Sequence, residues 1–177
     1  LPVQSGSDRV LRLMNRRYTR AHYIELVRKI RESIPRIGLS TDLIVGFPGE
    51  TEADFLETLD LAERVRYDSA FTFLYSIRKG TPAEKFEDQI PEDVKHERFN
   101  RLVDTINRIS AEKNAEYVGT VQQVLVEGTS KNDIMTYSGR TDGFKLVNFK
   151  ASEDLTGRMV SVRITESNTF SLVGELC

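Results

Sequence analysis

Residues 37–47 read IGLSTDLIVGF and are followed directly by PGETE at residues 48–52. A short apolar run that is closed by a Pro-Gly turn is typical of a buried strand in a parallel sheet. Thr51 then stands at an N-cap position with Asp54 three residues on, as in a capping box. The stretch therefore predicts a strand that leads through a tight turn into a helix reaching about residue 66.

The residues before this stretch predict one more strand and two helices. Residues 1–3 have the character of a strand end, and Ser7 can cap a short helix over residues 8–15. Thr19 opens a second helix with an apolar stripe, which Pro35 stops.

The residues after the stretch continue the alternation of helices and strands. Residues 70–75 (AFTFLY) predict another buried strand, and residues 78–83 (RKGTPA) predict a loop. A long amphipathic helix is expected from Pro91 to about Tyr117. This order favours an α/β fold built on a parallel sheet or barrel, with functional loops at the carboxyl ends of the strands.

Near Gly119 the pattern changes to short alternating apolar segments separated by turn residues, which indicates a small β-barrel. The segments are residues 121–126, 146–149, 159–164 and 170–173, and the turns are expected at residues 131–133, 142–143 and 166–169. We therefore expect two domains, residues 1–117 and residues 118–177.

Charge is nearly balanced overall, with 25 Lys and Arg against 27 Asp and Glu, which excludes a strongly basic protein. The charges are distributed unevenly. Most charged residues within residues 1–36 are basic, whereas residues 42–63 contain acidic residues and no Lys or Arg. A polyanionic partner is therefore expected on one face only.

Several classes of chemistry lack the residues that they need. The single cysteine, Cys177, cannot build a disulfide, a zinc site or an iron-sulfur site by itself. The two histidines, His22 and His96, lie in helical patterns among charged residues and are interpreted as surface residues. No run approaches 18 apolar residues, so no membrane association is expected. The absence of a P-loop or a Ser/His/Asp motif argues against phosphoryl transfer and hydrolysis.

The glycine at the end of the central strand, Gly46, is the strongest candidate for ligand binding. A glycine there lets a ligand approach the backbone closely, and the next helix offers unpaired N–H groups. An ordinary strand-to-helix turn is the alternative interpretation of the same residues.

Five segments together resemble one known family. They are LPVQSGSDRVLRLMNRRYT, STDLIVGFPGET, YSIRKGTPA, VLVEGTSK, and SGRT with KLVNF. In this order and spacing they resemble the C-terminal half of the radical S-adenosylmethionine (SAM) methylthiotransferases, most closely the MiaB type. The resemblance covers essentially all 177 residues.

The resemblance implies a partial radical SAM (TIM-like) parallel barrel followed by a TRAM domain, a small OB-like β-barrel. It also implies a cytoplasmic enzyme that uses S-adenosylmethionine and two [4Fe-4S] clusters to add a methylthio group to C2 of N6-isopentenyladenosine beside the anticodon of tRNA. The cysteines that hold both clusters in the family are absent here. The chain opens on Leu-Pro-Val-Gln, so we expect it to be a later part of such an enzyme, without metal ligands or catalytic residues of its own.

The family pattern also assigns binding residues and partners. It implies a SAM pocket lined by Gln4, Ser5, Ser7, Asp42 and Gly46. The implied partners are the tRNA anticodon stem-loop and the N-terminal domains of the same protein.

Basic residues near loops and turns are candidates for RNA contact. They are Arg16, Arg17, Arg78, Lys79, Lys131, Arg140, Lys145 and Lys150. For the lysines and arginines of the β-region, and for Arg16 and Arg17, solvated surface charge is the alternative. Two other functions also stay open: modification of an aspartate in a ribosomal protein, and RNA binding without catalysis.

Overall fold

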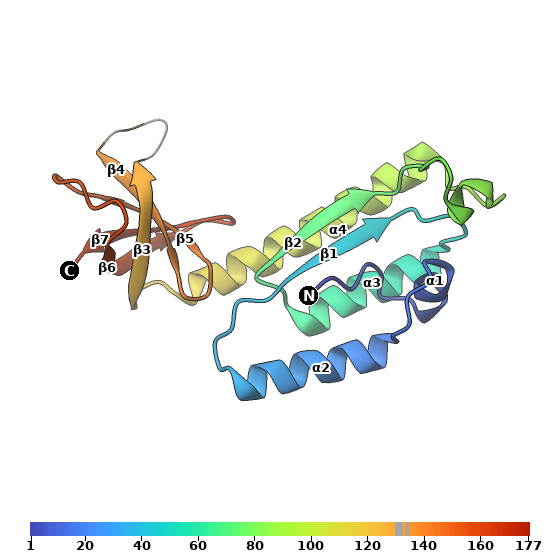
Figure 1. The fold of residues 1–177 in the computed structure, drawn as a ribbon, viewed down its shortest axis with the longest axis horizontal. Coiled ribbons are helices and arrows are strands. Elements are labelled where there is room, and N and C mark those ends of the chain that lie inside the picture. The colour runs from blue at the N-terminus through green and yellow to red at the C-terminus, as the bar shows by residue number, and fades with distance from the viewer. Residues whose placement is uncertain (130–132, 134) are drawn as a thin grey trace. The chain divides into compact units, whose positions relative to one another are not determined.

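The computed structural model of the chain describes residues 1–129, 133 and 135–177. They form two compact units (Figure 1). The first contains Leu1–Pro35 and Leu39–Ile109, and the second contains Arg36–Gly38 and Ser110–Cys177. The division falls inside the long helix, ahead of the change in sequence pattern near Gly119.

The first unit alternates helices and strands as the sequence predicts. Its elements are α1 (Asp8–Leu13), α2 (Arg20–Ser33), β1 (Ser40–Val45), α3 (Glu52–Val65), β2 (Ser69–Leu74), a 3-10 turn (Pro82–Lys85) and α4 (Glu92–Ala115), whose last turns belong to the second unit. The three expected N-caps are confirmed, because the side chains of Ser7, Thr19 and Thr51 each accept a backbone hydrogen bond from the first turn. Thr51 and Asp54 form the complete capping box.

The strands of this unit are parallel. β1 pairs with β2 from Ser40 opposite Ser69 to Val45 opposite Leu74. On the other side of β1, the Gln4 N–H donates to the Asp42 carbonyl at 2.9 Å, and the Ile44 N–H donates to the Gln4 carbonyl at 2.9 Å. The carboxyl ends of all three segments therefore meet at one edge of the sheet.

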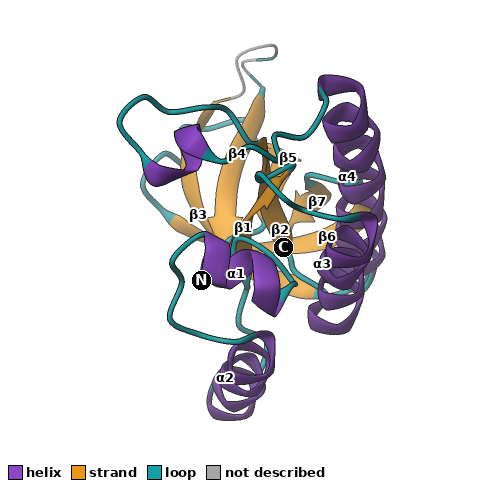
Figure 2. Cartoon of the chain, turned by 90° about the vertical axis from the view of Figure 1, so that its right-hand side faces the viewer, coloured by secondary structure: helices purple, strands orange, loops and turns teal. Residues whose placement is uncertain are grey.

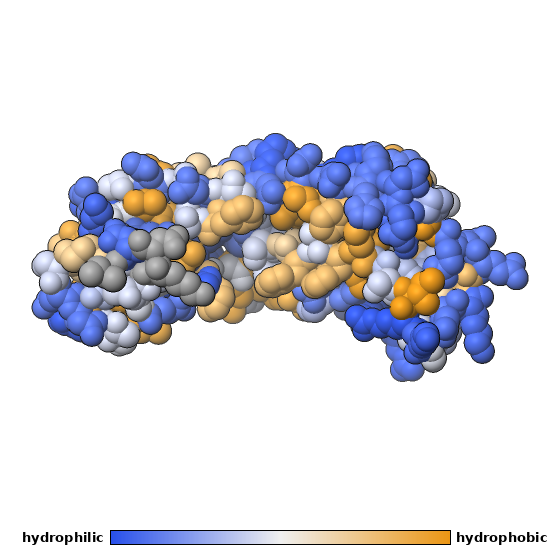
Figure 3. Space-filling model, turned by 90° about the horizontal axis from the view of Figure 1, so that it is seen from above, coloured by the Kyte–Doolittle hydropathy of each residue, from blue (hydrophilic) through white to orange (hydrophobic). Residues whose placement is uncertain are grey.

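The two faces of this sheet are different. Leu43 and Val45 of β1 are buried, and α3 and α4 lie together on one side of the strands (Figures 1 and 2). On the opposite face, Phe71 and Phe73 of β2 are 64% and 50% exposed. Figure 3, which views the molecule from above, shows exposed apolar residues among hydrophilic ones.

The second unit contains a closed five-stranded barrel in the order β3-β4-β5-β7-β6. Its strands are β3 (Val121–Thr129), β4 (Thr136–Thr141), β5 (Leu146–Lys150), β6 (Met159–Ser167) and β7 (Leu172–Leu176). β5 and β7 are parallel, and the other neighbours are antiparallel. Val124, Val147, Phe149 and Val162 are buried in its core, which confirms the expected OB-like barrel.

One strand of the barrel is missing from the sequence analysis. β4 reads TYSGRT, and Tyr137 is its one large apolar residue, so it lacks the alternating apolar signal. Gly139 lies so close to the Leu125 carbonyl that a Cβ would collide with it, and only pairing with β3 explains this glycine. The turn expected at residues 131–133 falls largely outside the described residues.

No helix within the described residues combines the length and the apolar character that crossing a membrane requires.

Candidate functional site

The loop from Gln4 to Ser7, which ends the first strand segment, is held against α3. The Ser7 hydroxyl donates to Asp54 Oδ1 at 2.6 Å and also caps α1. The Ser5 hydroxyl lies 3.4 Å from Thr58 Oγ1 and accepts from the Ser7 N–H at 3.2 Å. Both serines are buried, so their hydroxyl groups position the loop through α3.

Asp54 connects this loop to the N-terminus of α3. Its carboxylate accepts from the guanidinium of Arg9 and from the Thr51 N–H at 2.8 Å. Although desolvation opposes ionisation, the hydrogen bonds from Arg9, Ser7 and Thr51 hold the pKa of Asp54 well below its usual range. Asp54 is therefore ionised at neutral pH and fixes two loops at the sheet edge.

The loop after β1 is organised by a buried carboxylate. Glu50 is only 3% exposed, and its Oε1 accepts from the Gly46 N–H at 3.1 Å. Arg98 of α4 donates from Nη1 to both Glu50 Oε1 and the Glu50 carbonyl, each at 3.0 Å. Burial raises the pKa of Glu50 to about 7, against the opposing effects of Gly46 and Arg98.

Lys95 of α4 occupies the space beside Gly46. A Cβ added at Gly46 would collide with Lys95 Cγ, and Gly46 has a φ of +76°. Lys95 Nζ donates to the Tyr75 carbonyl at 3.3 Å and to Glu92 Oε1 at 2.7 Å. The glycine is therefore explained by backbone conformation and by the lysine stem, and its predicted contact with a ligand stays a prediction.

Aromatic rings line the same edge. Phe47 packs edge-on against Tyr75, with ring centroids 5.1 Å apart, and against Phe86 at 6.2 Å. The Tyr75 hydroxyl is buried and has no hydrogen-bond partner in the part of the chain that the structure describes. A buried donor without a partner is costly, so this hydroxyl is well suited to bind a polar ligand atom.

The structure places the five predicted SAM-binding residues at different positions around the parallel sheet. Gln4 and Asp42 are joined by a backbone hydrogen bond, and the register places Asp42 next to the exposed Phe71. The hydroxyl groups of Ser5 and Ser7 bond to α3 and hold the loop, and the place of these residues in the SAM pocket stays a prediction. Gly46 faces the stem of Lys95.

Sequence reasoning missed the contribution of α4 to this edge. Lys95 and Arg98 are buried although they are charged. Their spacing of three residues, followed by the buried Leu102 four residues on, continues one helical stripe. That spacing is the signal that could have identified them.

The residues present do not fit an iron-sulfur cluster. Cys177 is the one cysteine of the sequence and is exposed, whereas such clusters need several thiolates. Within the described residues, no group of three or more His, Cys, Asp or Glu could hold a metal ion. The polar groups Gln4 and Asp42, which lie side by side at mid-strand, and the Tyr75 hydroxyl beyond the end of β2, which has no partner among the described residues, suit an organic ligand such as S-adenosylmethionine.

The basic candidates of the first unit lie in two exposed loops. Arg16 and Arg17 follow α1, and Arg78 and Lys79 follow β2 at the carboxyl edge. All four are exposed, as contact with RNA requires.

The basic candidates of the second unit differ in exposure. Lys150 is exposed at the end of β5, and Arg140 lies near Glu127, with Nε 3.4 Å from Oε1. Lys145 is only 7% exposed, with Nζ 5.8 Å from the centroid of the Tyr117 ring. This burial argues against the predicted phosphate contact of Lys145, whereas Lys131 lies outside the described residues.

Two family models match the chain. The model of the radical SAM superfamily matches residues 1–62, and the model of the TRAM domain matches residues 115–177. The chain therefore joins part of a radical SAM domain to a TRAM domain, which confirms the expected fold class.

Proteins called tRNA-2-methylthio-N(6)-dimethylallyladenosine synthase are similar over nearly the whole chain. The one from Clostridium botulinum strain Okra is 63% identical over 175 residues, and the one from Clostridium beijerinckii is 58% identical over 176 residues. Each alignment covers 99% of this chain and 39% of the relative. The chain is thus similar to these relatives over nearly its whole length and spans about two fifths of theirs.

Proposed function

We propose that the chain orients cofactor and RNA in an enzyme that adds a methylthio group to C2 of N6-dimethylallyladenosine beside the anticodon of tRNA. The observation that carries the proposal is the 63% identity over 175 residues, which includes both units. Two [4Fe-4S] clusters belong to the proposed enzyme and need ligands other than the residues present here.

In the first unit, we assign cofactor binding to the carboxyl edge of the sheet. Gln4, Asp42 and the Tyr75 hydroxyl are the polar groups proposed to contact S-adenosylmethionine, which supplies the radical and the methyl group. Ser5 and Ser7 act as positioning residues, because their hydroxyl groups hold the loop through Thr58 and Asp54. Gly46 contributes its backbone at the turn.

In the second unit, we assign binding of the tRNA anticodon stem-loop to the barrel. Its OB-like architecture is one that binds nucleic acids through an outer strand face and connecting loops. Arg140 and Lys150 are proposed to contact phosphates. In the first unit, Arg16, Arg17, Arg78 and Lys79 are proposed to contact RNA as well, and the N-terminal domains of the enzyme are the proposed protein partner.

The decisive experiment uses the longer protein that contains this chain. Expressed in cells that lack the modification, it should restore the methylthio group in tRNA, as measured by mass spectrometry of nucleosides. A variant without residues 118–177 should still cleave S-adenosylmethionine reductively but should not modify tRNA. Equal loss of both activities in a folded variant would contradict the division of roles.

A second candidate function is RNA binding without catalysis, which is favoured by the lack of cluster ligands in this chain. The same experiment distinguishes the two proposed functions. If the longer protein binds tRNA but leaves its nucleosides unmodified, RNA binding alone is supported. If it modifies an aspartate of a ribosomal protein instead, the tRNA substrate is wrong.

A further inference from the structure

The turn between β4 and β5 holds an aromatic residue in an unusual conformation. Phe144 has a φ of +63°, in the left-handed region that bulky residues rarely adopt. The Phe144 N–H donates to the Thr141 carbonyl at 2.9 Å, and the Thr141 N–H donates to the Lys145 carbonyl at 3.0 Å. In hairpin loops of this kind the left-handed position usually belongs to glycine.

A glycine is present in the turn, but one residue earlier. The carbonyl of Gly143 packs against the backbone of Gly38. A Cβ placed on Gly38 would collide with this carbonyl. A Cβ on Gly143 itself would lie 3.4 Å from the Tyr117 hydroxyl. The close approach therefore restricts residue 38 to glycine, whereas position 143 has room for a Cβ, and the left-handed position of the turn falls on Phe144.

The side chain of Phe144 gains little from burial. Phe144 is 73% exposed, so its conformation is not compensated by hydrophobic contacts. The guanidinium carbon of Arg140 lies 4.6 Å from the ring centroid, and Arg140 Nη1 donates to the Phe144 carbonyl at 3.3 Å. One side of the ring therefore carries a cation, while most of the ring remains open to solvent.

The surroundings of the ring suit an anionic polymer with flat bases. Arg140 lies on the outer side of β4, because the alternate residues Gly139 and Thr141 are buried. On β5 the outward-facing positions include Asn148, and Lys150 ends the strand in an exposed position. A cation beside an exposed aromatic ring is the combination with which proteins stack single-stranded nucleobases.

We infer that Phe144 and Arg140 form a stacking platform for an unpaired RNA base, at a site separate from the proposed cofactor-binding edge. The inference rests on the proposed RNA-binding function and names the residue that contacts a base. Backbone strain at a solvent-exposed position is a feature of binding sites, because the surrounding contacts hold the residue ready for its ligand. A base stacked on the open side of the ring would contact the ring through its π-face alone. Because every base has such a face, any of the four bases could bind.

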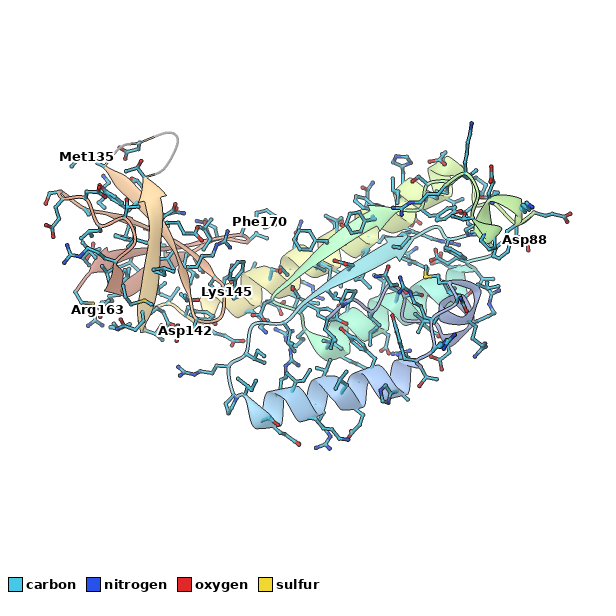
Figure 4. The ribbon with its side chains drawn as sticks, viewed as in Figure 1. Asp88, Met135, Asp142, Lys145, Arg163 and Phe170 are labelled. Carbon is cyan, nitrogen blue, oxygen red and sulfur yellow. The ribbon has the colours of Figure 1, made fainter. Side chains whose placement is uncertain are left out.

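The test uses the 177-residue chain, which contains no tryptophan. Phe144→Trp places a single fluorescent reporter in the platform, and Phe170→Trp places one at a control position. Phe170 is 75% exposed in the turn before β7, a different turn from the one that contains Asp142 and Lys145 (Figure 4). The probes are a labelled RNA hairpin with an unpaired loop and a fully paired RNA duplex, with binding followed independently by anisotropy.

We expect the hairpin to quench the indole fluorescence of Phe144→Trp and to leave that of Phe170→Trp unchanged. Phe144→Leu keeps an apolar side chain without a π-face and should weaken hairpin binding about 5- to 150-fold, with little effect on the duplex. Phe144→Asn tolerates the left-handed conformation, so its melting temperature should be equal to or higher than that of the wild type, while hairpin affinity falls. Loss of affinity without loss of stability separates base contact from a structural role.

Three results would overturn the inference. Unchanged hairpin affinity in Phe144→Leu, with binding itself intact, would reject the platform and leave the RNA-binding function standing. Equal quenching of the reporters in Phe144→Trp and Phe170→Trp would show non-specific contact. No binding of either RNA by any variant would contradict the RNA-binding function itself, and the platform with it.

Discussion

Arg98 of α4 and Glu50 of the loop after β1 form a buried ion pair, with 3.0 Å between Arg98 Nη1 and Glu50 Oε1. The same carboxylate accepts from the Gly46 N–H, and the same guanidinium nitrogen donates to the Glu50 carbonyl. One pair thus ties α4 to the strand end that we assign to cofactor binding. Its buried carboxylate also makes stability depend on pH.

The first prediction concerns this pH dependence. Because burial raises the pKa of Glu50 to about 7, the folded chain binds this proton more tightly than the unfolded chain does. The contribution is fully present below the unfolded pKa of about 4.5 and is lost as the pH rises through about 7. Between pH 5 and pH 8, the wild type should lose about 2 kcal/mol of unfolding free energy relative to Glu50→Gln. Urea denaturation of both proteins at the two pH values measures the difference, and parallel pH profiles would contradict it.

The second prediction separates two causes of glycine at position 46. Gly46→Ala should destabilise the chain by about 2–4 kcal/mol, because it adds strain at positive φ and a collision with Lys95. Lys95→Ala should relieve the collision but not the strain, so the double variant should lose less than the sum of the single losses. A double-mutant cycle measures this coupling. Additive losses would show that Lys95 does not restrict the site.

The third prediction concerns the hydrogen bond between Ser7 and Asp54. Ser7→Ala removes both the cap of α1 and a donor to a buried carboxylate, and should cost about 1–3 kcal/mol at pH 7. Since the pKa of Asp54 is depressed, its stabilising contribution is present above the unfolded pKa of about 3.8 and declines as the pH falls below that value. Asp54→Asn should therefore cost less at pH 2.5 than at pH 7. A loss of equal size at both values, measured by urea denaturation, would reject the role of its charge.

The fourth prediction uses the unpaired hydroxyl of Tyr75. Tyr75→Phe removes a buried polar group without a partner among the described residues, so the free energy of unfolding should stay equal or rise by up to about 1 kcal/mol. In the longer protein, the same change should weaken S-adenosylmethionine binding about fivefold to tenfold, since one hydrogen bond is lost. Calorimetric titration measures the affinity. Wild-type affinity would remove Tyr75 from the proposed site.

The fifth prediction compares an exposed lysine with a buried one. Lys150→Met should reduce the magnitude of the salt slope of tRNA binding by about 0.7–0.9, as expected for one phosphate contact. Lys145→Met is the matched control, because Lys145 packs over the Tyr117 ring and should leave the slope unchanged. The measurement is tRNA affinity of the longer protein across a salt series. A change of slope in the control alone would reverse the assignment.

Local signals of the sequence were sufficient for most of the elements in the first unit. Ser7, Thr19 and Thr51 act as caps because a cap is a contact within one helical turn, so the residues that form it are neighbours in sequence. Conversely, β4 escaped prediction because its pairing with β3 and β5, rather than an apolar pattern, makes it a strand.

The sequence by itself determined the order of the two kinds of fold, the helix caps, and the similarity to the relatives described above, since these depend on residue order and spacing. Only the tertiary structure decided which charged and aromatic residues are available. Lys95, Arg98 and Lys145 are charged residues of a kind usually found at the surface, yet they are buried because elements distant in the chain cover them. Residue 38 must be glycine because its backbone packs against the Gly143 carbonyl, a contact between residues about a hundred positions apart. Such contacts form when distant segments pack together, and no local pattern specifies them.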